Sequence, residues 1–204
     1  MSENALFSHV QAGNPLLEEA YWALEMANRY PHPETCAICL DEFWDAMDRY
    51  YAHISSFSGF TCQKGCSACC FDNPHGVSGI ELARIHPLLT PIQKDAIRLA
   101  STRFDSIEAT SPEEKQIHWK QECHPCPLLT KGTCSVYSVR PLACRSFFSR
   151  HAPDWCHPKH SQYQPQPQIG NDDIHALLVK LSLRFIGTGS TDLLSGLATL
   201  VEKK

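Results

Sequence analysis

Seven cysteines gathered in two short segments constrain this chain more than any other feature. They are Cys62, Cys66, Cys69 and Cys70 in the first segment, and Cys126, Cys134 and Cys144 in the second. Glycine interrupts the first segment, and glycine and proline interrupt the second, so neither has the regular period of a helix or strand. Irregular backbone of this kind can turn several sulfur atoms toward one point, and thiolates bind soft and borderline metals well. The pattern predicts that the two segments meet and hold a metal together.

The whole chain of 204 residues contains eleven cysteines, an odd number that excludes complete pairing as disulfides. In a reducing compartment, clustered cysteines are more often metal ligands or catalytic thiols than crosslinks. The N-terminus has neither a basic leader nor a continuous apolar stretch, so a secretory signal is not expected. These observations predict a cytoplasmic protein.

Outside the cysteine segments, apolar residues recur at helical spacing. Helices are expected at residues 15–30, 35–56, 78–86, 91–110, 111–123, 174–185 and 193–200. Asn14 before Pro15 and Ser111 before Pro112 are typical helix starts. No series of strands and no internal repeat stands out. The sequence therefore predicts a mainly α fold, with helices packed around irregular cysteine-rich metal-binding loops.

Three parts are expected along the chain. Residues 1–156 would form a helical domain whose cysteine core spans about 60–148, and residues 171–204 a helical pair that packs on it. Residues 157–170, rich in Gln and Pro, would connect them as an extended segment. This connector and Tyr163 could dock a peptide partner, although a plain linker is the favoured interpretation.

The seven clustered cysteines form the candidate ligand pool. Adjacent Cys69 and Cys70 are not expected to reach the same single ion, so either the second segment completes one site or two sites share the segments. An all-thiolate pool favours an iron-sulfur cluster, with 4Fe-4S first, over Zn²⁺. The alternative is that these cysteines are small buried apolar residues.

The remaining cysteines and nearby arginines have separate interpretations. Cys36 and Cys39 lie on the apolar stripe of an expected helix and should pack in the core, whereas the sequence leaves Cys123 and Cys156 undecided. Two cations, Arg140 and Arg145, occur inside the second segment and could neutralise a negatively charged thiolate centre. An anion-binding surface for a carboxylate or phosphate is the alternative for these side chains.

At these residues the chain resembles the CxxCxxCC cysteine-cluster family, a zinc- or iron-chelating domain. The second segment carries the resemblance through Cys126, Pro127, Leu128, Leu129, Cys134, Val136, Tyr137, Arg140, Pro141, Cys144 and Arg145. The first segment departs from the signature because three residues, and not two, separate Cys62 from Cys66. The resemblance implies zinc or iron chelation with the seven clustered cysteines as the ligand pool. Flagellin lysine methylases look like relatives that carry such a motif, which adds an S-adenosylmethionine-dependent protein methyltransferase to the candidates.

Three functions remain open from the sequence. The first is an iron-sulfur protein with a redox or protein-modification role, the second a zinc-stapled structural or interaction module, and the third a methyltransferase. No catalytic triad or carboxylate pair stands out, so whether the protein is an enzyme and which residues would be catalytic stay unassigned. A net charge of −4 argues against nucleic acid, and no apolar run reaches the roughly 20 residues of a membrane span. A protein or peptide partner is compatible with these features, and the oligomeric state is open.

Overall fold

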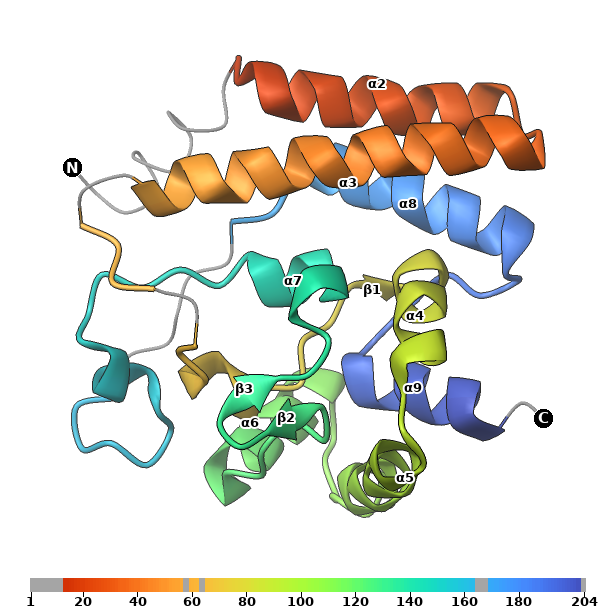
Figure 1. Ribbon diagram of the computed structural model, residues 1–204. Helices are drawn as coiled ribbons and strands as arrows, with labels where there is room; N and C mark the ends of the chain where they lie inside the picture. The colour runs from red at the N-terminus through yellow and green to blue at the C-terminus, as the bar shows by residue number, and fades with distance from the viewer. Residues whose placement is uncertain (1–12, 57–58, 63–64, 164–168, 203–204) are drawn as a thin grey trace.

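A computed structural model describes residues 13–56, 59–62, 65–163 and 169–202. The N-terminal residues on which the expectation about a secretory signal depends lie outside these ranges. Residues 164–168 of the Gln/Pro-rich connector also lie outside them. The helices are α2 (Pro15–Arg29), α3 (Pro33–Ser56), α4 (Gly79–Ile85), α5 (Pro91–Asp105), α6 (Pro112–Glu122), α7 (Leu142–Arg145), α8 (Asp172–Phe185) and α9 (Leu193–Glu202). The predicted mainly α fold class is confirmed (Figure 1).

Side-chain caps explain where several helices begin. The Asn14 side chain accepts a hydrogen bond from the Leu16 amide at the start of α2, and Ser111 caps α6 in the same manner. Both helices have proline in their first turn, which needs no amide partner there. The two starts read from the sequence are therefore confirmed.

Extended structure is short and antiparallel in the described residues. One pair joins β1 (Val77–Ser78) to β4 (Ser190–Thr191), and the other joins β2 (Leu129–Thr130) to β3 (Thr133–Cys134). Single turns of 3-10 helix complete the cysteine segments: η1 (Ala68–Phe71), η3 (Tyr137–Val139) and η4 (Pro153–Cys156). A further one, η2 (His86–Leu88), follows α4.

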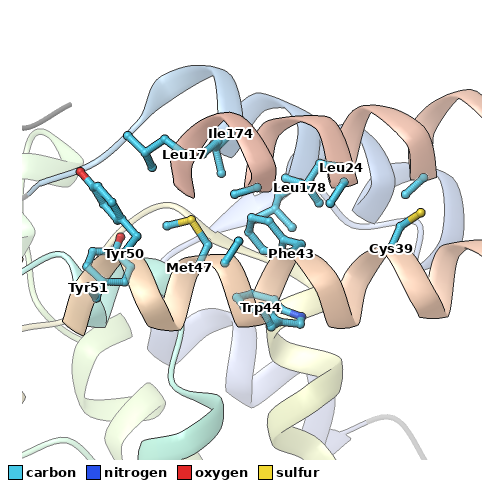
Figure 2. Packing of buried hydrophobic residues seen from close by; sticks show 14 of the residues in the cluster. Leu17, Leu24, Cys39, Phe43, Trp44, Met47, Tyr50, Tyr51, Ile174 and Leu178 are labelled. Atoms are coloured by element: carbon cyan, nitrogen blue, oxygen red, sulfur yellow. The ribbon is translucent and has the colours of Figure 1, made fainter. Parts of the chain in front are cut away.

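One apolar core lies between α2, α3 and α8, which form the upper layer of the molecule (Figure 1). Phe43, Leu24 and Leu178 are fully buried where these helices meet (Figure 2). Cys36 and Cys39 belong to the same core, so the prediction that they pack inside is confirmed. Of the seven clustered cysteines, only Cys62 packs against this core.

A second core holds α4, η2, α5 and α9 together, and the second cysteine segment packs directly against it. Leu128 and Val136 from that segment are buried beside Ile85 and Leu197. The half-buried Cys126, Cys134 and Cys144 also contact this core, as members of the group that surrounds it. Apolar packing thus fixes the backbone that carries three of the predicted ligands.

Gly196 marks the closest approach between α9 and α4. A Cβ placed there would lie 2.5 Å from Leu82 Cδ1 and 2.7 Å from Thr191 Cγ2. Overpacking a core costs about 1–3 kcal/mol, whereas alanine in place of glycine gains about 1 kcal/mol of helix propensity. We expect Gly196→Ala to lower the free energy of unfolding by about 1 kcal/mol, measured by urea denaturation. Thr199→Ala on the exposed side of α9 is the matched control and should stay within about 0.5 kcal/mol of wild type; an equal effect in both variants would contradict the close packing.

The described part of the connector folds back against the molecule and is less extended than the sequence suggests. Its Tyr163 ring lies 5.7 Å from the Lys120 ammonium on α6, and the His157 ring packs on Phe71 with centroids 4.5 Å apart. Among the described residues, no helix has both the length and the apolar character needed to cross a bilayer.

Candidate metal centre

The two cysteine segments meet around one cavity. A hydrogen bond of 2.7 Å from the Cys126 amide to the Cys70 carbonyl joins them. The cavity has a volume of about 50 Å³, and we call it the cage. Six thiols line it: Cys66, Cys69, Cys70, Cys126, Cys134 and Cys144. Residues separated by more than fifty positions along the chain are thus brought together at one place.

Cys62 is set apart from these six thiols. It lines a neighbouring cavity, and its sulfur accepts a hydrogen bond of 3.1 Å from the Ser149 amide. Burial raises the pKa of the Cys62 thiol to about 11, which the Ser149 amide partly offsets. Of the seven candidate ligands, Cys62 is therefore the one that does not line the cage.

A tight hairpin presents Cys126 and Cys134 to the cage. Its turn holds Lys131 and Gly132, with φ angles of 51° and 77°. Two successive positive φ angles are typical of the turn that matches the twist of a two-residue hairpin, and glycine adopts this conformation without steric cost. The hairpin pairs Leu129 with Cys134, so the two cysteines lie near the same end of it.

Backbone amides donate to the sulfurs of the hairpin cysteines. Burial raises the pKa of Cys126 to about 12, and the Leu128 amide that donates to its sulfur opposes this shift. Burial also raises the pKa of Cys134, against a donated hydrogen bond from Val136. These thiols therefore stay protonated at neutral pH in the absence of a cation, and a metal that binds them must displace the protons. The amide donors favour the thiolate once it forms.

Five of the six cage thiols are linked through effects on pKa, and a hydrogen bond with Cys70 is the largest cause of the raised pKa of Cys69. Burial raises the pKa of Cys144 well above its usual value, and neighbouring Cys126, Cys69 and Cys134 raise it further. Cys69 also raises the pKa of both Cys126 and Cys134. Among the described residues, no three Cys, His, Asp or Glu side chains are already close enough to hold one ion. Binding of one ion by these thiols therefore requires some of them to move closer together.

The two candidate arginines have different surroundings. Arg140 lowers the pKa of Cys134 and Cys144 against the larger opposing effect of burial, and that of Cys69 against the larger effects of a hydrogen bond with Cys70 and of burial. The Arg145 guanidinium instead donates to the carbonyls of Arg140 (2.8 Å) and Ser138 (2.7 Å). Arg145 also forms an ion pair with Asp48 of α3. Arg140 is thus the cation that acts on the thiols, and Arg145 fixes the loop that carries it.

A buried carboxylate that the sequence analysis missed anchors the segment of Cys144. Glu81 Oε1 accepts a hydrogen bond from the Leu142 amide (2.7 Å), at the start of α7. Its Oε2 accepts from the Ser78 amide and hydroxyl, both at 2.7 Å. The Ser78-x-x-Glu81 spacing indicates a capping box for α4, but nothing local to it predicts the long-range bond to Leu142.

Burial raises the pKa of Glu81, against the donated hydrogen bonds and nearby His175. The folded state therefore favours the protonated carboxyl, and the stability that this form contributes is lost as the pH rises from the ordinary glutamate pKa of about 4.3 toward the higher folded value. Glu81→Gln cannot titrate. The advantage of wild type over this variant should therefore be greatest at the acidic end and shrink toward neutral pH. Urea denaturation of both proteins, first treated with chelator, measures this difference, and a difference independent of pH would contradict the assignment.

Cys123 and Cys156 are buried but do not line the cage. Cys123 ends α6 in the left-handed conformation with a φ of 58°, and its sulfur lies 3.9 Å from His157 Nε2. Cys156 belongs to η4, which packs against η1, and it raises the pKa of Cys62. Neither is placed with the six thiols.

The donor set of the cage suits a thiophilic metal. Its described lining contains six sulfurs and no imidazole, and the carboxylate in it, Asp72, is paired with Lys120 at 2.5 Å. Thiolates are the ligands of iron-sulfur clusters and of all-cysteine zinc sites. Hard cations such as Ca²⁺ and Mg²⁺, which prefer oxygen ligands, do not fit this lining.

Comparison with known protein families matches residues 61–169 to one described as "CxxCxxCC: Putative zinc- or iron-chelating domain". The match includes all seven clustered cysteines and both candidate arginines. Comparisons with curated proteins and with solved structures find no significant match to the chain. Because the matched range spans more than half of the 204 residues, the chain belongs to the CxxCxxCC family of zinc- or iron-chelating domains.

Proposed function

We propose that this protein binds an iron-sulfur cluster, of the 4Fe-4S type, through thiolates of the cage. The observation that carries the proposal is the convergence of six cysteines from two distant segments on one cavity whose described lining offers no histidine. Iron-sulfur clusters are held by cysteine thiolates, usually four of them. The family assignment supports metal chelation, and the six thiols of the lining favour iron-sulfur ligation within it.

The best candidates for direct ligation are Cys144 and the three cage cysteines that raise its pKa: Cys69, Cys126 and Cys134. Cys66 and Cys70 line the same cavity and complete the pool on the first segment. Cys62 ranks last because it does not line the cage, although Cys69 and Cys66 raise its pKa. This ranking narrows the seven cysteines of the family motif.

The bound cluster would supply electron transfer or Lewis-acid chemistry, in a redox or protein-modification role. The chain's own residues would tune it. The Arg140 guanidinium offsets negative charge on the thiolates, and the amides of Leu128 and Val136 donate to the sulfurs. Hydrogen bonds to sulfur and burial are the features with which proteins set cluster potentials. A thiolate centre of this kind fits a reducing compartment, and we propose that the protein works in the cytoplasm.

A structural zinc ion is the second candidate. Cys126 and Cys134 each accept a hydrogen bond from the backbone amide two residues further along the chain. Thiolates stabilised in this way would equally suit a site in which four cysteines hold one Zn²⁺. In that case the metal would supply folding energy to an interaction module. The fold does not support methyl transfer, because the described residues form only two pairs of strands and each strand is two residues long.

Anaerobic purification followed by measurement of iron, acid-labile sulfide and zinc per chain tests the proposal. A 4Fe-4S protein would contain about four iron and four sulfide per chain, with visible absorption from thiolate-to-iron charge transfer. Zinc without sulfide would overturn the iron-sulfur proposal in favour of the zinc candidate. A protein that retains neither metal would overturn both.

A further inference from the structure

A second and larger cavity lies directly against the cage. Its volume is about 390 Å³, within the range of small-molecule sites. Three thiols line both spaces: Cys66, Cys69 and Cys144. The opposite wall belongs to α3, through Tyr51 and Ala52. A molecule in this cavity would therefore lie between α3 and the metal-binding thiols.

Most of the charge around this cavity is already paired. Asp48 and Arg145 form an ion pair, and Arg145 also donates to two carbonyls of the loop that follows Tyr137. Arg145 is 6% exposed, so this pair holds the wall in place and leaves little for a ligand. The pairing cancels one negative and one positive charge.

Arg140 is the cation of this cavity that the ion pair between Asp48 and Arg145 does not neutralise. Its side chain lines both the cage and the larger cavity, and its guanidinium lies over the Tyr137 ring at 4.1 Å. Its Nε is buried and has no hydrogen-bond partner within the described residues. Leaving a buried donor unsatisfied is costly, and more so for a charged group. An acceptor supplied from outside the chain would remove this cost.

We propose that the larger cavity binds a small molecule through its oxyanion, a carboxylate or phosphate group, which Arg140 holds beside the metal centre. The proposal rests on the metal centre proposed above. Arginine presents planar pairs of N–H donors that match such oxyanions bidentately. Phe147, Phe148 and Tyr51 line the same cavity and would contact the apolar part of the molecule. The ligand class is thus a small organic acid or phosphate ester with an apolar portion.

Binding an oxyanion is compatible with the effect of Arg140 on the thiols. A guanidinium has five N–H donors in a fixed fork, so some can face sulfur while others face the cavity. Arg140 lines both the cage and the larger cavity. This position is what a residue needs if it is to act on the thiols and bind an oxyanion.

Isothermal titration of the metal-loaded protein with inorganic phosphate and with benzoate tests the proposal, with metal and sulfide measured in the same samples. At least one probe should bind wild type, and Arg140→Gln should weaken it by about 10- to 100-fold, the value of hydrogen bonds to a charged group. Ala52→Trp, on an exposed position of α3, should narrow the cavity and weaken binding of benzoate while metal content stays at the wild-type level. Arg150→Gln, an exposed arginine that does not line the cavity, is the control and should bind as wild type.

If neither probe binds metal-loaded wild type at millimolar concentration, the oxyanion site is overturned. Probe binding by Arg140→Gln as tight as that of wild type, or benzoate binding by Ala52→Trp as tight as that of wild type, would also overturn it. If the same samples contain iron and sulfide, the proposed function would still hold in those cases. Conversely, a protein that purifies without metal and still binds a probe through Arg140 would overturn the proposed function and retain the cavity. Circular dichroism confirms that each variant is folded.

Discussion

Cys134→Ala should abolish metal binding. Cys134 lies on β3 at the cage, affects the pKa of Cys144, and receives the amide of Val136 at its sulfur. Alanine removes one ligand but keeps the backbone pairing of the hairpin, because that pairing uses main-chain atoms only. Changes to residues around ligands cost about 10–100-fold in metal affinity, so loss of a ligand should cost at least as much. Metal and sulfide analysis after anaerobic purification measures the loss.

Cys39→Ala is the matched control for this variant. Cys39 is buried in the core between α2, α3 and α8, far along α3 from the cavity-lining residues of that helix (Figure 2). It should retain full metal content at a cost of about 1 kcal/mol in unfolding free energy. Equal metal retention in both variants, or equal loss, would refute the ligand assignment. Circular dichroism shows whether Cys134→Ala remains helical.

Removal of the metal should be the most destabilising change made without altering the sequence. Structural zinc contributes about 10–16 kcal/mol to peptides that have no other core. This chain has two apolar cores of its own, so a smaller loss of about 4 kcal/mol is expected on chelation. For a protein of this size that loss lowers the melting temperature by about 8–16 °C. Calorimetry before and after anaerobic chelation measures the shift.

The loss should also be local. The second cysteine segment packs on the core of α4, α5 and α9 and depends on the cage, whereas α2, α3 and α8 form a separate core (Figure 1). Hydrogen exchange should therefore show that amides of residues 126–145 lose protection on chelation while those of α3 and α8 keep theirs. An unchanged melting temperature with uniform protection would contradict a structural role for the metal.

The helices could be predicted from the sequence because their signals are local. Asn14 and Ser111 cap helices where the polar residue and the following proline indicate it, and the apolar stripe of α3 placed Cys36 and Cys39 correctly in the core. The pair of β1 with β4 escaped the sequence analysis. Its two-residue strands are too short to show alternation, and Ser78 pairs with a residue more than a hundred positions away.

The meeting of the two cysteine segments could be predicted from the sequence, and the arrangement of the side chains around them could not. Spacing and composition predicted that the two segments meet, and the cage brings six of the seven thiols together with Cys62 to one side. Adjacency in sequence did not show that Arg145 turns toward Asp48 while Arg140 acts on the thiols. The bond from Leu142 to Glu81 spans 61 positions. These features depend on tertiary packing, which no local pattern reports.

X-ray absorption at the metal edge of the anaerobically purified protein tests the central claim most directly, since it counts the atoms bound to the metal. A centre built from both cysteine segments requires a first coordination shell of sulfur only, with metal–sulfur distances of about 2.3 Å. An additional iron–iron shell would identify the cluster, and its absence with zinc would identify the single ion. A first shell dominated by nitrogen or oxygen would contradict convergence of the two cysteine segments on one metal.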